Sequence, residues 1–308
     1  MAFSIKGFRH CLLRGLCLLL LASPAWATDA LLVLSDISPS YNQVQEAIFN
    51  TAHTAPRSIT LDRLQPQDSR TPIIIAIGSR ACERTLRQYH PGTRLVCSFL
   101  PSSTFKQLRT TLLPGNTNAR ISAIFIDQPL ARQVRLARLI RPEARVLGTA
   151  LGQSSLTLKG LLERAAESEV FTLQLAELAP SDNPIQRLTP VVENSDLFLV
   201  VPDSSIFNRA ISKWLLYLSL KHRVPVIGFS QSYTDAGAAA SVHSSPLQIG
   251  QQTGEWLNQL NADQPLPQPG HPIYFDVSIN PVAARTLGLE LPSPAALQRH
   301  LARIEAAN

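Results

Sequence analysis

One short run in this chain, Pro72-Ile73-Ile74-Ile75-Ala76-Ile77, carries no charged or hydrogen-bonding side chain and strongly limits the possible folds. Its β-branched residues favour an extended strand. A strand without a polar face has to be covered on both sides, as in parallel sheets that carry helices on both faces. The run therefore predicts the middle strand of an α/β sheet.

Similar apolar runs alternate with amphipathic helical stretches along the whole chain. The first half predicts strands at 31–34, 58–64, 72–77, 94–99 and 121–126, and helices at 41–52, 80–89 and 103–112. The second half predicts strands at 145–151, 170–175, 197–201 and 225–229, and helices at 130–140, 156–167, 185–192 and 206–221. A tail adds strands at 238–242 and 273–277 and helices at 248–260 and 295–304. Such alternation is typical of parallel sheets with right-handed crossover helices.

The length of 308 residues suits two domains better than one core. We expect an α/β fold of two Rossmann-like lobes, with residues 28–127 and 247–308 in lobe 1 and residues 128–246 in lobe 2. The chain would then pass between the lobes near 127–130, 244–247 and 272–280, which makes a hinge of several crossings.

The N-terminus has the pattern of a signal peptide. Lys6, Arg9 and Arg14 precede a short apolar run at 16–22, and Ala25-Trp26-Ala27 is a small-x-small cleavage site. The run is too short to span a bilayer in the ordinary way. We expect residues 1–27 to be removed after Ala27, leaving a periplasmic protein that begins at Thr28. An uncleaved membrane anchor is the alternative.

Charge argues against a nucleic-acid partner. The chain has 28 Lys and Arg against 22 Asp and Glu, and the leader holds three of the basic residues and no acidic one. The remaining excess of 25 over 22 is small and is spread along the chain. The series Arg132, Arg135, Arg138 and Arg141 is predicted to be the solvent face of a helix.

Two cysteines, Cys82 and Cys97, remain in the mature chain. In an oxidising compartment they could form a disulfide across a loop of about 15 residues. They could equally be two separate buried thiols, and the spacing does not decide between these.

Polar, short-chained residues follow most of the predicted strands. In open parallel sheets, ligands bind beyond the carboxyl ends of the strands, where helix N-termini present unpaired N–H groups. Ser and Asp are also ordinary helix N-caps, so a single one of them does not indicate a ligand site. The repetition of such polar loops in both halves of the chain is what indicates one. The candidate ligand contacts are Asp36, Ser38, Tyr41, Ser79, Arg80, Ser102, Asp127, Gln153, Ser154, Asp203, Ser204, Phe207, Ser230, Gln231 and Tyr233. Among them, Arg80 and Asp203 could bind the carboxylate and the amine of a ligand.

Catalytic patterns are weak. Gly228-Phe229-Ser230-Gln231-Ser232 approaches the nucleophile elbow of serine hydrolases, but Ser232 replaces the last glycine and 233–237 is predicted to be a loop where the elbow needs a helix. The histidines have no metal-ligand spacing, and no glycine-rich nucleotide loop is present. We expect no catalytic residues, no metal and no cofactor, with a serine hydrolase using Ser230 as a remote alternative.

Three stretches resemble the tryptophan/tyrosine-type family of periplasmic ABC-transporter substrate-binding proteins. They are Asp127-Gln128-Pro129 with 141–148, the segment 197–203 with the helix after it, and 224–230 with 237–242. The resemblance implies a periplasmic binding fold of type I, in which two lobes close around an amino acid or a similar small polar solute. It implies ligand contacts at Ser79, Gln153, Asp203 and 230–233.

The resemblance also implies a partner. A monomeric binding protein of this kind delivers its ligand to an inner-membrane ABC permease. The alternative is a ligand-sensing module of the same fold that presents its ligand-bound form to a membrane receptor or kinase.

Overall fold

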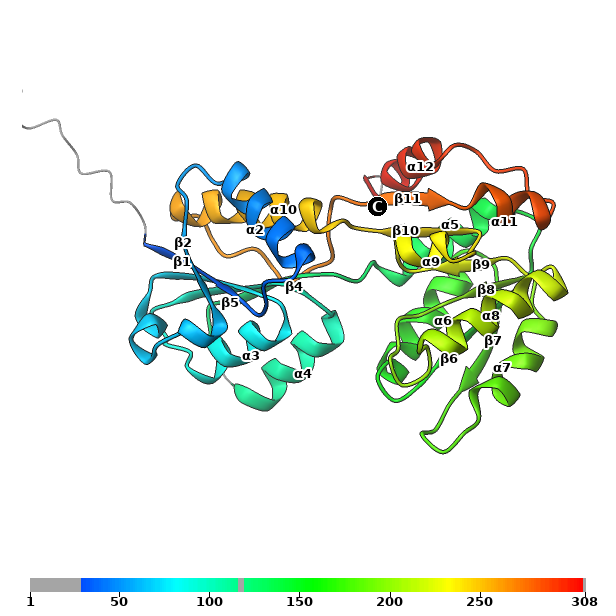
Figure 1. Ribbon diagram of the computed structural model, residues 1–308, viewed down its shortest axis with the longest axis horizontal. Helices are drawn as coiled ribbons and strands as arrows, with labels where there is room; N and C mark the ends of the chain where they lie inside the picture. Colours follow the sequence, from blue (N-terminus) through cyan, green and yellow to red (C-terminus); the bar gives the residue numbers. More distant parts are fainter. Residues whose placement is uncertain (1–28, 116–118, 307–308) are drawn as a thin grey trace, which may run out of the picture.

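The computed structural model describes residues 29–115 and 119–306, so the predicted signal peptide lies outside the described residues. The chain forms two α/β lobes that lie side by side (Figure 1). The predicted fold class is therefore confirmed.

Lobe 1 is built on a parallel five-stranded sheet in the order β2-β1-β3-β4-β5. Its strands are β1 (Ala30–Leu34), β2 (Arg57–Thr60), β3 (Ile73–Ile77), β4 (Arg94–Leu100) and β5 (Ile121–Phe125). The charge-free run forms β3, which lies in the middle of the sheet and is buried along its whole length. Two short 3₁₀ helices, Leu61–Arg63 and Pro66–Arg70, follow β2 and end it earlier than predicted.

Helices cover both faces of this sheet (Figure 1). They are α2 (Pro39–Thr51) and α10 (Pro246–Asn261) on one face, and α3 (Ser79–Arg87) and α4 (Ser102–Leu112) on the other. Alternate residues of β1 serve the two faces, because successive side chains of a strand point in opposite directions. Leu32 packs with Val44 of α2 and Leu257 of α10, whereas Leu31 packs with Leu86 and Phe105 on the opposite face.

Helices α2 and α10 touch closely at a glycine. A Cβ atom at Gly250 would lie 2.5 Å from the carbonyl oxygen of Val44 and 2.7 Å from the Cβ of Ala47. Only glycine allows this approach, which holds α10 on lobe 1 although the strands on either side of it belong to lobe 2.

Lobe 2 contains a six-stranded sheet in the order β11-β10-β9-β8-β6-β7, parallel except for β11. The strands are β6 (Val146–Leu151), β7 (Thr172–Glu177), β8 (Leu197–Leu199), β9 (Val226–Gly228), β10 (Ala240–His243) and β11 (Asp276–Ile279). The helices are α5 (Leu130–Ile140), α6 (Lys159–Ser168), α7 (Pro184–Glu193), α8 (Arg209–His222), α9 (Gln231–Asp235), α11 (Pro281–Thr286) and α12 (Pro294–Ala306), with a 3₁₀ turn at Leu156–Leu158. The apolar residues of α5, α6 and α12 form one core, and those of α7 and α8 form the other.

The prediction that all of 247–308 belongs to lobe 1 is wrong. Only α10 and the segment after it, up to Gly270, return there, and Gly270 exchanges backbone hydrogen bonds with Ala123 and Phe125 of β5. In contrast, β11 pairs antiparallel with β10, and α12 packs on β11 and α5. Phe275 and Val277 complete the apolar core of lobe 2, together with Leu297 and Leu301 of α12. Pairing with β11 also satisfies the backbone groups of β10 at what would otherwise be the edge of the sheet.

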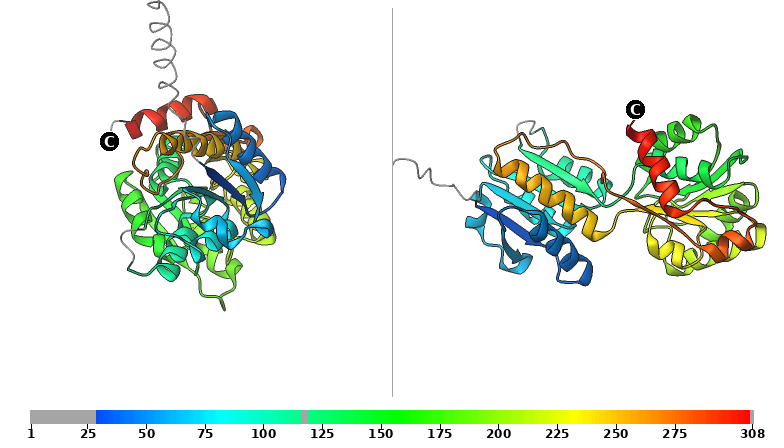
Figure 2. Two further views of the ribbon diagram at one scale, coloured as in Figure 1. Left: turned by 90° about the vertical axis from the view of Figure 1, so that its left-hand side faces the viewer. Right: turned by 90° about the horizontal axis from the view of Figure 1, so that it is seen from above.

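The chain therefore passes between the lobes three times (Figure 2). The crossings are 126–129 before α5, 244–245 before α10, and 271–275 before β11. We refer to them below as the first, second and third crossing.

The arginines of α5 do not face solvent as predicted. Arg132 is buried and bonds to Glu305 of α12, and Arg135 pairs with Glu169 at 2.8 Å. Arg138 stacks on the ring of Phe171 and donates to carbonyl groups of the following loops. The helix lies between other elements of lobe 2, and its periodicity alone cannot distinguish a solvated face from one covered by α6 and α12.

Cys82 of α3 and Cys97 of β4 form a disulfide, with the two Cα atoms 5.3 Å apart. This decides between the two alternatives that the sequence left open. The bond ties the helix to the strand beneath it in the core of lobe 1.

Candidate functional site

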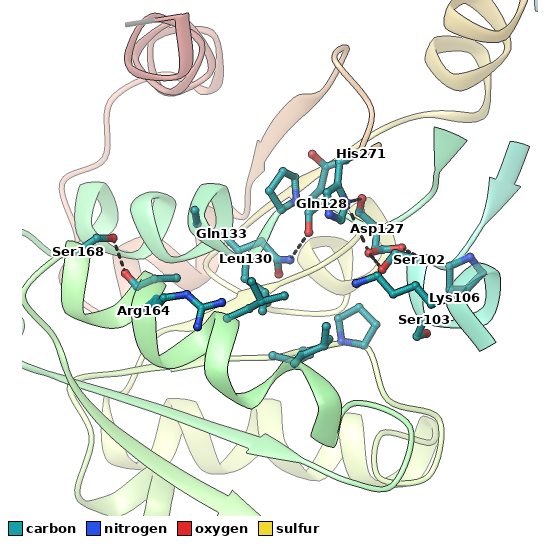
Figure 3. A pocket seen from close by; sticks show the side chains of 18 residues that line it. Ser102, Ser103, Lys106, Asp127, Gln128, Leu130, Gln133, Arg164, Ser168 and His271 are labelled. Carbon is teal, nitrogen blue, oxygen red and sulfur yellow. Dashed lines mark hydrogen bonds and ion pairs between the residues drawn. The ribbon is translucent and has the colours of Figure 1, made fainter. Parts of the chain in front are cut away.

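A pocket of about 370 Å³ lies at the junction of the two lobes (Figure 3). Lobe 1 contributes the start of α4, and lobe 2 contributes α5, α6 and the loop after β8. The first and third crossings contribute the residues between them. Its lining residues are Pro101, Ser102, Ser103, Lys106, Asp127, Gln128, Pro129, Leu130, Ala131, Gln133, Leu158, Leu161, Arg164, Ala165, Ser168, Val201, Pro202 and His271. The volume falls within the range of small-molecule sites.

Asp127 fixes the lobe 1 side of the pocket. Its carboxylate accepts from the backbone N–H of Ser102 at 2.6 Å and from the Ser102 hydroxyl at 2.7 Å. Ser102 is the first residue of α4, so Asp127 caps the helix from the first crossing, two residues after β5. His271 of the third crossing lies 3.6 Å from the same carboxylate through Nδ1, which also bonds to the Asp127 carbonyl at 2.8 Å.

Two glutamines, Gln128 and Gln133, line the part of the pocket next to the crossings. The side chain of Gln128 donates to the Ser244 hydroxyl and accepts from Arg132. Gln133 is 1 % exposed and donates through Nε2 to the Gln128 carbonyl at 3.1 Å. The Oε1 atom of Gln133 is buried without a hydrogen-bond partner among the described residues. A buried acceptor of this kind would be stabilised by a donor from a bound molecule.

Lys106 and Arg164 approach the pocket from opposite sides (Figure 3). Lys106 lies on α4 of lobe 1, one turn after Ser102, and Arg164 lies on α6 of lobe 2. Both residues are exposed. The remaining walls are largely apolar and include Leu130, Leu158 and Leu161.

Of the predicted ligand contacts, Ser102 and Asp127 line this pocket. Asp36 and Arg80 line a separate hollow of about 620 Å³ on lobe 1, beside the ends of β1 and β2. Four of the predicted contacts therefore line hollows of the structure, two in the pocket between the lobes and two in the hollow on lobe 1.

Asp203 is not available to bind a ligand amine. It is 4 % exposed, and one carboxylate oxygen accepts from the Gly152 N–H and from the N–H and hydroxyl of Ser155, at 2.7 to 3.1 Å. The other oxygen accepts from the N–H and hydroxyl of Ser205. Burial raises the pKa of Asp203, but the hydrogen bonds from Ser205 and Ser155 outweigh it and leave the pKa below its usual value. Its role is to hold together the loops that follow β6 and β8.

The three aromatic residues among the predicted ligand contacts, Tyr41, Phe207 and Tyr233, pack within their own lobes. Tyr41 lies over Gly78, where a Cβ atom would come within 2.5 Å of the tyrosine hydroxyl, and its ring meets Phe99 edge to face. Tyr233 is buried against Phe229 and Gly228, and Phe207 packs against the core of lobe 2 that includes α7 and α8. None of these three residues lines the pocket between the lobes.

The remaining candidates are polar residues outside this pocket. Ser38, Ser79 and Ser230 are half-buried, and Gln153, Ser154, Ser204 and Gln231 are exposed. Ser230 is the N-cap of α9 and accepts from the Tyr233 N–H at 3.3 Å. The five-residue helix α9 stands where a loop was predicted, so that argument against a nucleophile elbow is wrong. However, no histidine within residues 29–115 and 119–306 bonds to the Ser230 hydroxyl, which acts as a cap.

Four further residues of the pocket, Lys106, Gln133, Arg164 and His271, are not among the predicted contacts. The first three lie on helices rather than in the loops after strands, and His271 lies in a crossing. Their position at the pocket depends on how the two lobes pack against each other, and no local sequence pattern predicts that packing. The only local signal is that Lys106 follows Ser102 by one helical turn.

The described part of the chain contains no group of three or more His, Cys, Asp or Glu that could hold a metal ion. Likewise, none of its helices is long and apolar enough to cross a membrane.

No protein-family model matches the chain, and no curated protein matches it either. Solved structures do match over most of its length. A ligand-free, open substrate-binding protein with adhesive properties from Clostridium difficile overlaps with a TM-score of 0.68 at 13 % identity, covering 86 % of this chain and 96 % of the other.

Two further structures overlap over 88 % of this chain and 98 % of their own. One is an ABC domain in complex with L-Trp from Streptococcus pneumoniae, with a TM-score of 0.54 at 15 % identity. The other is a conserved domain protein from Vibrio cholerae, with a TM-score of 0.56 at 18 % identity. The fold is thus that of the two-lobed type I binding proteins. The resemblance in fold that the sequence predicts is therefore confirmed.

Proposed function

We propose that this protein is a periplasmic solute-binding protein whose two lobes close around a small ligand for an ABC transporter. The observation that carries the proposal is the pocket at the junction, because α4 of lobe 1 and α5 and α6 of lobe 2 all line it. A ligand that touches both lobes stabilises the arrangement in which they approach each other.

The three crossings fit this action. Lobe movement would bend the chain at 126–129, 244–245 and 271–275, and two of these segments contribute residues to the pocket. A ligand at this place would contact the hinge as well as the lobes. A solved substrate-binding protein and a domain in complex with L-Trp, both of the same fold, support the class. The partner we propose is an inner-membrane permease.

We also propose the periplasm as the location. The leader at 1–27 has the pattern of an export signal. The Cys82–Cys97 disulfide is typical of a protein that folds in an oxidising compartment.

A thermal-shift screen of the mature protein, from Thr28 onward, tests the proposal. The panel contains amino acids, small peptides, sugars, purines and organic anions. A ligand at about 100 times its dissociation constant should stabilise the folded protein by about 2.7 kcal/mol. Ser103→Trp would fill the pocket and abolish the shift, whereas Asn50→Trp, at an exposed site on α2, would keep it. A folded protein that responds to no compound would contradict the proposal.

A further inference from the structure

The pocket between the lobes holds more positive than negative charge. Lys106 and Arg164 line it, and neither takes part in any ion pair formed by the described residues. One cation belongs to each lobe, so an approach of the lobes brings two like charges toward the same space. In the absence of an anion, this repulsion opposes closure.

The acidic side chains in and near the pocket already have hydrogen-bond partners within the protein. Asp127, the only carboxylate among the described residues that line the pocket, caps α4 through Ser102 and lies beside His271. Asp203 is buried and bonded to five donors of its own lobe. Within its described residues, lobe 2 therefore presents no carboxylate in this pocket to a ligand ammonium group.

The rest of the pocket suits a partly apolar molecule. Leucines of α5 and α6 form one wall, together with Val201 and Pro202 after β8. Beside them lies the unpartnered Oε1 of Gln133, which accepts but cannot donate. A bound molecule with one hydroxyl or N–H group could supply the missing donor.

On the basis of the function proposed above, we infer that the ligand is an organic carboxylate without a positive charge of its own. Its anionic group binds between Lys106 and Arg164, and its apolar body packs against Leu130, Leu158 and Leu161. Lysine and arginine both bind carboxylates through charge-assisted hydrogen bonds. Because the two cations come from different lobes, the carboxylate also turns their repulsion into an attraction that favours closure.

Two matched series of probes separate the charge of the ligand from its shape. The aromatic series is phenylacetate, 2-phenylethylamine, L-phenylalanine and 2-phenylethanol, and the aliphatic series is hexanoate, hexylamine, L-norleucine and hexanol. Calorimetric titration of the mature protein should show that the carboxylate binds most tightly in at least one series, by about tenfold or more over the others. Its affinity should also fall as salt is raised, since exposed charges are screened.

Variants locate the binding. Lys106→Gln and Arg164→Gln should each lower the affinity for the carboxylate by about tenfold, and Lys106→Arg should keep most of that affinity. Lys213→Gln removes an exposed cation of α8 outside the pocket and should change nothing. The unliganded melting temperatures of the four variants show that each one is folded.

Three outcomes would overturn the inference. In the first, the zwitterion, the amine or the alcohol binds more tightly than the carboxylate in both series. In the second, the carboxylate binds but is indifferent to Lys106 and Arg164. In the third, no probe binds. If a sugar or a purine from the thermal-shift panel still stabilises the protein in any of these cases, the solute-binding function stands and only the ligand class is wrong.

Discussion

Gln128 and Ser244 lie in two different crossings, and the Gln128 Nε2 atom donates to the Ser244 hydroxyl at 2.8 Å. The same Ser244 hydroxyl donates to the Tyr274 carbonyl of the third crossing. Arg132 adds a bond of 2.5 Å to the Gln128 Oε1 atom and one of 3.2 Å to the Pro272 carbonyl. All three crossings are therefore joined by one set of hydrogen bonds, which we call the hinge network.

Helix α12 extends the hinge network to the end of the described chain. The guanidinium group of Arg132 makes two bonds to the Glu305 carboxylate, at 2.6 and 2.7 Å, and lies 3.9 Å from the centre of the Phe275 ring. Arg132 is 5 % exposed, so its charge depends on these partners.

Glu305→Gln should lower the free energy of unfolding by about 1–2 kcal/mol, because it leaves the buried Arg132 without its countercharge. Urea denaturation measures the change. Arg303→Gln, at an exposed position of the same helix, is the control and should be neutral. Equal effects of the two substitutions would show that the ion pair does not support the hinge network.

Asp203→Asn should destabilise lobe 2 by about 2–3 kcal/mol. The amide replaces one carboxylate oxygen by a donor, which then faces the N–H and hydroxyl donors of the loops after β6 and β8. Thermal melting against Ser204→Ala, an exposed neighbour, measures the loss. An unchanged melting temperature would contradict the role of Asp203 in joining these loops.

Acid should remove the stabilisation of lobe 2 that the Asp203 carboxylate provides. The pKa of Asp203 is lowered in the folded protein, so its stabilising effect is complete above the ordinary pKa of about 3.9. The effect is lost as the pH falls through the folded value. The stability difference between wild type and Asp203→Asn should thus be constant from pH 8 to about 5 and shrink below about 4. A difference that stays constant or grows in acid would contradict the direction of the pKa shift.

The disulfide should stabilise lobe 1. Cys82 and Cys97 are 15 residues apart, a loop for which cross-linking contributes about 3 kcal/mol. A reductant should lower the melting temperature of the mature wild-type protein and leave that of Cys82→Ala/Cys97→Ala unchanged. The structure would be contradicted if two free thiols titrate in the native protein before reduction.

Much of this architecture can be predicted from residue pattern. The charge-free run at 72–77 predicts a central strand, and β3 is one. The predicted strand at 273–277 is displaced toward the C-terminus, to Asp276–Ile279, and its lobe is assigned wrongly. The sequence of a single strand does not determine which sheet edge it will join. That choice depends on the open side of β10 and on the apolar surface that α12 brings.

The binding site is predicted less well than the fold. Ser102 and Asp127 follow strands, and that rule predicts them. Lys106, Gln133 and Arg164 lie within helices, where a polar residue normally faces water. In contrast, Asp203 has the position and residue type of a ligand contact but uses its oxygens to join two loops. The number of donors around a carboxylate is a property of the folded chain, which spacing does not reveal.

Lobe closure is the central claim, and the distance between α4 and α6 measures it most directly. Spin labels on Thr110→Cys and Glu163→Cys, which are exposed on these two helices, report that distance by double electron–electron resonance. The measurement is made with and without a saturating amount of the compound that gives the largest thermal shift. We predict a single, shorter distance when the compound is bound. An unchanged distance distribution at saturation would contradict closure around a ligand.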